Sequence, residues 1–326
     1  GIKLIMPPII ILYLLFLISP SLFKEFVKKV MKMYFLLFIP IFVIAILENF
    51  LGVSFLTDVL GIPYGTSFLK ISHIWGTYRT IATFRQPYDF GFFSFVISVF
   101  ALSRLIKLKR SKIWSFIFLI MGSAALYLST SRTNIVSFAY STIIFASIFG
   151  LMNFIRDSKI KIFSFLLAST IIVLAIFSPY AYSAFSQSEI SLFSTKSLAE
   201  RFYVWSNALS SFPINDFPHL LVGYGMGAIG TAQLKINPLL YNAVDNMYIY
   251  SLINFGLVGT ILLVWLSFIS VKKSFLKIKE LDWIQIGFVL LTTSMIFIQG
   301  FFVSYAEGLL SWGVFWLGIL YLRSSL

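Results

Sequence analysis

The sequence predicts an all-α, polytopic integral membrane protein with about nine transmembrane helices, and its composition is the first reason. Of its 326 residues, 59% are hydrophobic and only 11% are charged. Soluble domains carry about 45–50% apolar and about 25% charged residues. A soluble chain of this length has no means of burying so much apolar surface, so we expect a bilayer as its solvent.

The apolar runs are the second reason, since about twenty apolar residues cross a bilayer as a helix. Two connections, 49–87 and 179–244, are too long to be turns and are rich in Gly, Pro, Ser, Asn and aromatic residues. We expect short interfacial or re-entrant helices there. Residues 1–326 are therefore interpreted as one polytopic membrane domain, with 179–244 as a large extracytoplasmic loop between spans six and seven. The expected spans are 4–20, 33–48, 88–105, 113–130, 132–150, 161–178, 245–270, 283–302 and 305–322.

The distribution of basic residues is the third reason and predicts the orientation. Most of the 25 Lys and Arg fall in alternate loops, and the acids balance the bases in the others, so the net charge of +13 lies on one side. By the positive-inside rule that side is cytoplasmic. We therefore attribute the basic character to topology and expect no nucleic-acid partner. The basic segments are 24–32, 104–112, 156–161, 272–279 and Arg323.

Four arginines lie on the predicted outward side, against this bias. The structural explanation is snorkelling to the interface or pairing with Glu48, Asp89 or Glu200. The functional explanation is that charged residues in a membrane region are often part of a site. Arginine recognises phosphate through two parallel hydrogen bonds, so the group favours a phosphate-bearing ligand. The four are Arg79, Arg85, Arg132 and Arg201.

Cofactor and metal motifs are poorly supported. Residues 225–230 match G-x-G-x-x-G, but the dinucleotide fingerprint needs a preceding strand and a following helix, so we expect a tight loop instead. His73 and His219 stand in different loops and the chain has no cysteine. We expect no metal and no cofactor. We interpret His73 either as an interfacial structural residue or as a residue that contacts the substrate.

The stretch 245–259, DNMYIYSLINFGLVG, begins a predicted span with a carboxylate and an amide. Asp is a favoured helix N-cap, because its oxygen accepts an otherwise unpaired N–H and its charge suits the helix dipole. We therefore expect Asp245 to cap this helix. Gly256 and Gly259 are expected to let neighbouring helices pack closely.

Four segments in this order resemble the O-antigen polymerase and ligase family of bacterial envelope glycosyltransferases. They are TFRQPYDFGFF, STSRTNIVSF, ERFYVWSNAL with LLVGYGMG, and DNMYIYSLINFGLVG, which together span roughly 79–260. Members of that family usually have more spans, and residue 1 is Gly, so we expect an N-terminally truncated chain.

The resemblance implies a metal-independent polysaccharide polymerase in the bacterial cytoplasmic membrane, with its active site facing outward. Its donor and acceptor would be undecaprenyl-diphosphate-linked glycans, polymerised into O-antigen or capsule, with a chain-length regulator as a further partner. The alternatives are an O-antigen ligase, a lipid-linked glycan flippase or transporter, and a structural assembly subunit. Ligases have His where this chain has Asp245, which favours the polymerase.

The resemblance also implies roles for individual residues. Arg132 and Arg201 are the best candidates for binding the diphosphate, followed by Arg85 and Arg79. Asp245 is the expected catalytic base, and Asn246 is expected to orient it or the acceptor. Tyr203, Trp205 and Tyr224 are candidates for sugar contacts, with the ordinary interfacial aromatic belt as their alternative.

Overall fold

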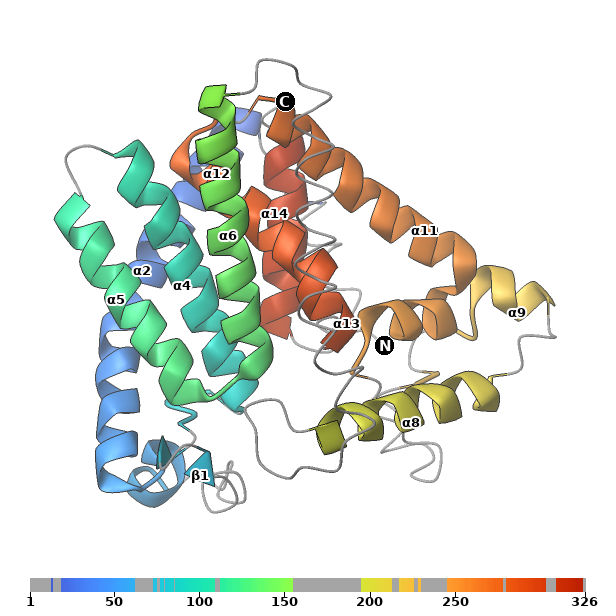
Figure 1. Ribbon diagram of the computed structural model, residues 1–326, viewed down its shortest axis with the longest axis horizontal. Coiled ribbons are helices and arrows are strands. Elements are labelled where there is room, and N and C mark those ends of the chain that lie inside the picture. Colours follow the sequence, from blue (N-terminus) through green and yellow to red (C-terminus); the bar gives the residue numbers. More distant parts are fainter. Residues whose placement is uncertain are drawn as a thin grey trace.

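The computed structural model shows a helical bundle, as the sequence predicts (Figure 1). The only strands in the described part of the chain are two-residue β1 (His73–Ile74) and β2 (Thr77–Tyr78), which pair antiparallel. The helices are α2 (Pro20–Leu51), η1 (Phe55–Val59), α4 (Pro87–Lys107), α5 (Lys112–Ser129), α6 (Arg132–Phe154), α8 (Thr195–Ser211), α9 (Phe217–Val222), α11 (Met247–Leu276), α12 (Trp283–Ser294), η3 (Met295–Gln299), α13 (Gly300–Phe302) and α14 (Leu309–Ser324). The structure describes residues 13, 19–61, 73–74, 77–78, 80–84, 86–108, 112–154, 195–212, 217–225, 228–229, 245–277, 280–302 and 309–324.

The predicted spans agree with most of these helices, although the total of nine is not confirmed. By length and apolar character, four described helices are able to cross a membrane: α2, α4, α5 and α11. The α12 and α14 helices are apolar but shorter. The expected span 161–178 lies outside the described residues. Of the expected span 4–20, the structure describes only residues 13, 19 and 20. The chain is therefore a multi-pass membrane protein.

Helix α4 forms the centre of the bundle, packed against α5, α6 and α12. Every residue from 90 to 101 is buried, which is the pattern of a helix that is apolar on all sides and surrounded by others. Phe100 packs edge-to-face on Phe288 with ring centroids 5.1 Å apart. By contrast, α2, α5 and α11 expose large apolar side chains such as Leu36, Ile120 and Ile261, as expected for lipid-facing helices.

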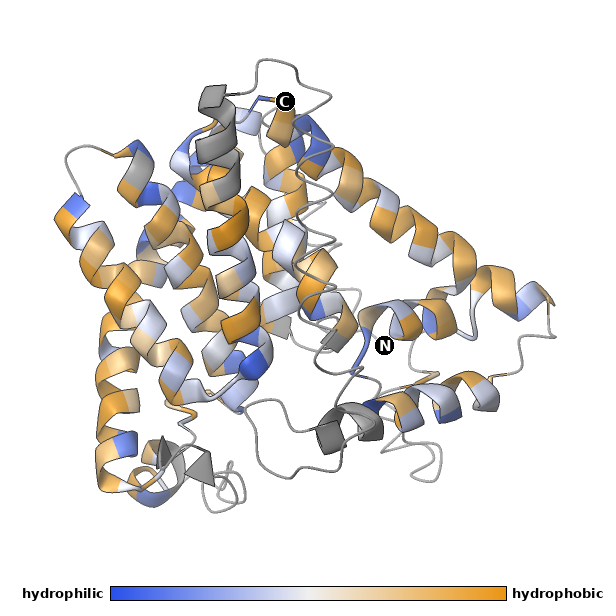
Figure 2. Ribbon diagram, viewed as in Figure 1, coloured by the Kyte–Doolittle hydropathy of each residue, from blue (hydrophilic) through white to orange (hydrophobic). Residues whose placement is uncertain are grey.

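Charged residues separate to the two ends of the bundle. The end at the top of Figure 2 holds the basic segments at the start of α2, the end of α4 and the ends of α11 and α14. The opposite end holds the end of α2, helix α8 and the starts of α6 and α11 (Figure 1). Glu48, Arg201, Arg132 and Asp245 belong to these segments. The basic ends of helices that are far apart in sequence therefore lie on the same side of the bundle, as the alternating loop charges predict. We call these the basic end and the site end.

The orientation in the membrane is a first testable prediction. The chain has no cysteine, so single cysteines at the exposed positions Ser206 and Lys277 report the two ends. An impermeant thiol reagent added to intact cells is expected to label Ser206→Cys and to spare Lys277→Cys until the membrane is opened. Labelling in the reverse pattern would invert the topology.

Helix α11 is two helices joined by a break, which corrects the expected single span 245–270. Gly256 has φ 66° and ψ −172°, and the chain changes direction sharply there (Figure 1). Residues 247–255 form a short arm at the site end. Residues 257–276 form a second arm, about 30 Å long at 1.5 Å per residue, which is enough to cross a hydrocarbon core.

The glycine-rich loop after α9 fills the break in α11. The backbone N–H groups of Tyr224 and Gly225 donate to the carbonyls of Ile253 (2.8 Å) and Asn254 (3.1 Å). These two carbonyls would otherwise bond to the next turn of a continuous helix. Gly223 and Gly225 have φ of 78° and 91°, so the loop is tight, as expected. Gly256 thus packs closely against the end of helix α9, at Leu221, and against the loop that follows it.

Gly256→Ala is expected to destabilise the protein by about 2–4 kcal/mol. The left-handed backbone disfavours a side chain, and the new Cβ would overlap the carbonyl of Leu221 and lie 2.5 Å from the backbone nitrogen of Gly223. Thermal unfolding in detergent measures the effect. Gly313→Ala is the matched control, because a Cβ there meets nothing within 4 Å. Equal melting temperatures for both variants would contradict this account of the break.

Candidate active site

The tip of the α5–α6 hairpin carries Arg132. Thr130 turns the chain with φ 47°, the N–H of Ser131 donates to the Ser129 hydroxyl at 3.2 Å, and Arg132 is the partly buried first residue of α6. The positive end of the helix dipole lies there and disfavours a cation. Arg132 therefore does not stabilise its own helix, and an anionic partner would explain its position better.

A buried hydrogen-bond network joins this hairpin to α4 and η3. The Asn134 side-chain amide donates to the backbone oxygen of Tyr88 (3.2 Å) and to the Ser131 hydroxyl (2.7 Å). The Gln299 amide donates to Asn134 Oδ1 at 2.9 Å, and the Tyr88 hydroxyl makes a longer contact of 3.5 Å to Gln299 Oε1. Gly91 allows the approach, since a Cβ there would lie 2.8–2.9 Å from three hairpin side chains. The network fixes the starts of α4 and α6 against each other.

Gln299 is a residue that sequence reasoning missed. Its side chain is fully buried, and it ends the π-helical turn η3, a feature that is frequent at functional sites. The available signal was a polar residue late in the apolar run 283–302, because polar residues within membrane helices usually hydrogen-bond to neighbouring helices. The partners of that hydrogen bond were not visible in the sequence.

Asn246, and not Asp245, caps α11, which corrects the expected cap. Its side-chain oxygen accepts from the N–H groups of Tyr248 (2.9 Å) and Ile249 (3.1 Å), and its amide nitrogen donates to the Phe301 carbonyl at 3.4 Å. Asn246 is 4% exposed. Its contacts hold the start of α11 against α13. The Asp245 carboxylate is thereby left for another role.

The structure brings two predicted site residues, Arg201 and Asp245, into contact. Arg201 Nη2 lies 3.7 Å from Asp245 Oδ2, with 29% and 52% of the two side chains exposed. Arg201 and the core-facing Ala208 share one side of α8, two turns apart, so α8 holds the guanidinium against the start of α11. Asp245 also interacts electrostatically with the phenol of Tyr88. The carboxylate therefore lies between the loop helix and the buried network.

The protonation of Asp245 is subject to two opposing effects. Burial raises the pKa of Asp245 above its ordinary value, and the charge of Arg201 acts in the opposite direction. Half of the side-chain surface nevertheless remains accessible. An ionised carboxylate with a raised pKa is a better proton acceptor, and an accessible one is able to meet a hydroxyl group from outside.

The candidate aromatic residues have separate surroundings. Tyr203 is 69% exposed on α8, and Trp205 packs edge-to-face on Phe202, with centroids 5.0 Å apart. The Tyr224 ring stacks on His219 at 4.4 Å. Tyr203 is two residues from Arg201 and therefore faces a different side of α8. For His73 the structure gives only its backbone, paired with Tyr78 in the strand pair.

Arg79 and Arg85 lie outside the described residues, but the segment between them is held firmly. Glu48 Oε2 accepts from the backbone N–H groups of Ile81 (3.1 Å) and Ala82 (2.7 Å), and Oε1 accepts from Phe55 at 2.9 Å. Glu48 is 2% exposed. Glu48 is thus a backbone anchor at the site end.

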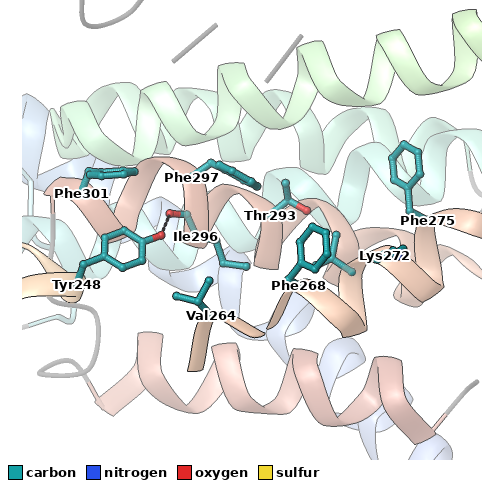
Figure 3. A pocket seen from close by; sticks show the side chains of 10 residues that line it. Tyr248, Val264, Phe268, Lys272, Phe275, Thr293, Ile296, Phe297 and Phe301 are labelled. Atoms are coloured by element: carbon teal, nitrogen blue, oxygen red, sulfur yellow. Dashed lines mark hydrogen bonds between the residues drawn. The ribbon is translucent and has the colours of Figure 1, made fainter. Parts of the chain in front are cut away.

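An apolar cavity of about 200 Å³ begins close to this site and runs along the second arm of α11 (Figure 3). Tyr248, two residues after the Asn246 cap, lies at one end and donates its hydroxyl to the Ile296 carbonyl. Phe297 and Phe301 line one wall, and Lys272 and Phe275 lie toward the other end. The lining is almost entirely apolar and therefore suits a hydrocarbon chain.

Within the described ranges, no group of three or more His, Asp or Glu side chains lies close enough together to hold a metal ion. The residues that the structure brings together are thus a cation, a carboxylate, buried amides and an apolar cavity.

Comparison with known proteins supports the predicted resemblance. Residues 116–264 match the profile of the O-antigen ligase family. The matched range contains Arg132, Arg201, Asp245 and Asn246, whereas the segment 73–85 precedes it. No curated protein and no solved structure matches the chain. The family match is consistent with the O-antigen polymerase and ligase family, and it supports a role in O-antigen or polysaccharide assembly by a glycosyltransferase-like enzyme.

Proposed function

From this family match in a multi-pass membrane protein, we propose that the chain polymerises undecaprenyl-diphosphate-linked oligosaccharide repeat units into O-antigen or capsular polysaccharide at the outer face of the cytoplasmic membrane. The observation that carries the proposal is the contact of 3.7 Å between Arg201 and Asp245. It joins a cation suited to a diphosphate with a carboxylate suited to a proton.

The proposed reaction needs both groups. A hydroxyl oxygen of the acceptor sugar attacks the anomeric carbon of the donor glycan, and the bond from that carbon to the diphosphate oxygen breaks. The electron pair leaves with the diphosphate, whose growing charge must be stabilised. The hydroxyl proton passes to the Asp245 carboxylate. Products are a glycosidic bond, free undecaprenyl diphosphate and a protonated Asp245.

Arginine is a good partner for the leaving group because its planar fork matches two phosphate oxygens. Arg201 contributes from α8, and Arg132 contributes together with the positive end of the α6 dipole, which also favours anions. When a diphosphate engages Arg201, the charge that lowers the pKa of Asp245 is partly neutralised. Donor binding would then make Asp245 a stronger base.

The apolar cavity supports a lipid-linked donor. It begins at Tyr248, close to Asn246 and Asp245, and extends along the second arm of α11. A head group near Asp245 would allow the attached prenyl chain to enter this cavity from the site end.

Purified protein with lipid-linked repeat units tests the proposal. A ladder of polymer lengths is expected, formed without any nucleotide sugar. The second candidate is an O-antigen ligase, which the family match favours by its description. A ligase would transfer one glycan to a different lipid acceptor and give a single product. Asp245 in place of the ligase histidine supports the polymerase.

Chelation gives a further prediction. Because arginines would supply the positive charge for the leaving diphosphate, ladder formation is expected to continue at an unchanged rate in excess EDTA. Rates are compared before and after dialysis against the chelator. Loss of the ladder, with recovery on adding magnesium, would contradict the proposed role of the arginines.

A further inference from the structure

A second cavity lies at the basic end, far along the bundle from the candidate active site. It has a volume of about 400 Å³, within the usual range of about 300–1,000 Å³ for ligand sites, and it lies between α11 and α14. These helix ends lie side by side at the top of Figure 1. The lining residues are Ile269, Ser270, Lys273, Leu276, Lys277 and Arg323.

Three cations converge on this cavity. Lys273 lies in the last turn of α11, and Lys277 is the C-cap residue that follows the helix. Arg323 comes from the last turn of α14, about fifty residues later in the chain. None of the described residues that line the cavity is a carboxylate. Within the described ranges, none of the three forms an ion pair. The described lining of the cavity therefore carries three positive charges.

Topology and helix dipoles explain part of this charge. The positive-inside rule favours Lys and Arg at this end of every span, and cations are stabilised at helix C-termini. These effects act on each helix separately. They do not explain why cations from two helices line one cavity, or why the apolar Ile269 and the half-exposed Leu276 line it as well.

We propose that this cavity binds the phosphate of an anionic membrane phospholipid at the inner leaflet. Arg323 offers the two-pronged fork that fits phosphate oxygens, and the lysines add mobile point charges. The apolar walls continue into the lipid-facing side of α11, where Trp265 and Phe268 are exposed, so the acyl chains remain in the bilayer. Basic pockets between helices on the cytoplasmic side are suited to such head groups.

The test uses the full chain purified in a neutral detergent and titrated with phosphatidylglycerol, with binding followed by native mass spectrometry. Phosphatidylcholine, which has no net charge, is the comparison lipid. Wild-type protein is expected to prefer phosphatidylglycerol. The variant with Lys273→Gln, Lys277→Gln and Arg323→Gln is expected to bind it about a hundredfold more weakly, at about fivefold per cation.

The matched control removes three exposed cations of α2 that also lie at the basic end of the bundle: Lys28→Gln, Lys29→Gln and Lys32→Gln. It changes the net charge equally and is expected to keep the wild-type affinity. Equal losses in both variants would mean a general surface-charge effect and would overturn the site.

Two further arms complete the test. Arg323→Lys keeps the charge and the fold but loses the fork, and it is expected to weaken binding about threefold, which is less than the loss of the whole cation. Wild-type affinity in this variant would overturn the role of the fork. Millimolar inorganic phosphate is expected to leave phosphatidylglycerol binding unchanged, because it has no acyl chains. Full displacement by inorganic phosphate would overturn the lipid as the ligand.

Discussion

Asp245→Asn is expected to insert and fold like the wild-type protein and to form polymer at least about a hundredfold more slowly, the usual range for a lost general base. The substitution keeps the size of the side chain and removes its ability to accept a proton. It does not disturb the start of α11, because Asn246 makes the capping hydrogen bonds. Initial rates of ladder formation measure the loss, and size-exclusion chromatography checks the fold.

Asp58→Asn is the matched control for that variant. Asp58 is also an exposed carboxylate at the site end, and its Oδ2 accepts from the N–H of Ser54 at 2.6 Å. It has no proposed part in catalysis, so a normal ladder is expected. A wild-type ladder from Asp245→Asn itself would remove the base and leave its carboxylate as a partner of Arg201 only.

The pH dependence of the wild-type rate follows from the same assignment. The base is inactive when protonated, so the rate is expected to fall as the pH drops through the pKa of Asp245. Burial raises that pKa, so the fall should occur above the value of about 3.9 for a free aspartate. A rate that stays constant through this range would mean that another group accepts the proton.

Arg201→Lys and Arg132→Lys are each expected to lower the polymerisation rate about tenfold or more, on the scale of one lost transition-state contact. Lysine keeps the charge but not the planar fork. For Arg201 the attraction to Asp245 also persists, so the start of α11 should remain in place. Rates at saturating donor separate this loss from weaker donor binding.

Arg104→Lys is the control for the same chemical change at the basic end. Arg104 lies over the rings of Phe35 and Trp283, at 4.9 and 5.1 Å from their centroids, and has no proposed part in catalysis. Its variant should retain the wild-type rate. Full activity in both Arg201→Lys and Arg132→Lys would return these arginines to an interfacial role.

Much of the fold was predictable because membrane helices follow from local sequence. The apolar runs between residues 88 and 150, and the hairpin turn near residue 130, predicted the bounds of α4, α5 and α6 to within a few residues. Glycine and polar positions were harder to interpret. The break at Gly256 depends on the 223–225 loop meeting the carbonyls of residues 253 and 254, which is a contact between distant segments.

Within the candidate site, the sequence indicated the chemical groups but not their partners. Arg132 and Arg201 stood out because they are arginines on the side that the positive-inside rule leaves without excess charge, and Asp245 stood out because it begins a predicted span. Glu48 was one of three carboxylates that the sequence offered as partners for the arginines, and the structure shows that it accepts hydrogen bonds from backbone N–H groups. Gln299 was missed, because an uncharged amide in an apolar run has no local signature of the hydrogen bond it makes.

The sequence by itself determined that the chain is built for a bilayer, that it is helical, and that its basic segments share one side. These properties depend on hydropathy and charge summed over single segments. The sequence also determined the family resemblance. Only the tertiary structure decided that Asn246 is the cap, that α11 is two arms, and that Arg201 lies 3.7 Å from Asp245. Each of these depends on which distant groups satisfy a buried polar atom or a charge. In a medium without water such partners come from elsewhere in the chain, and no local pattern specifies them.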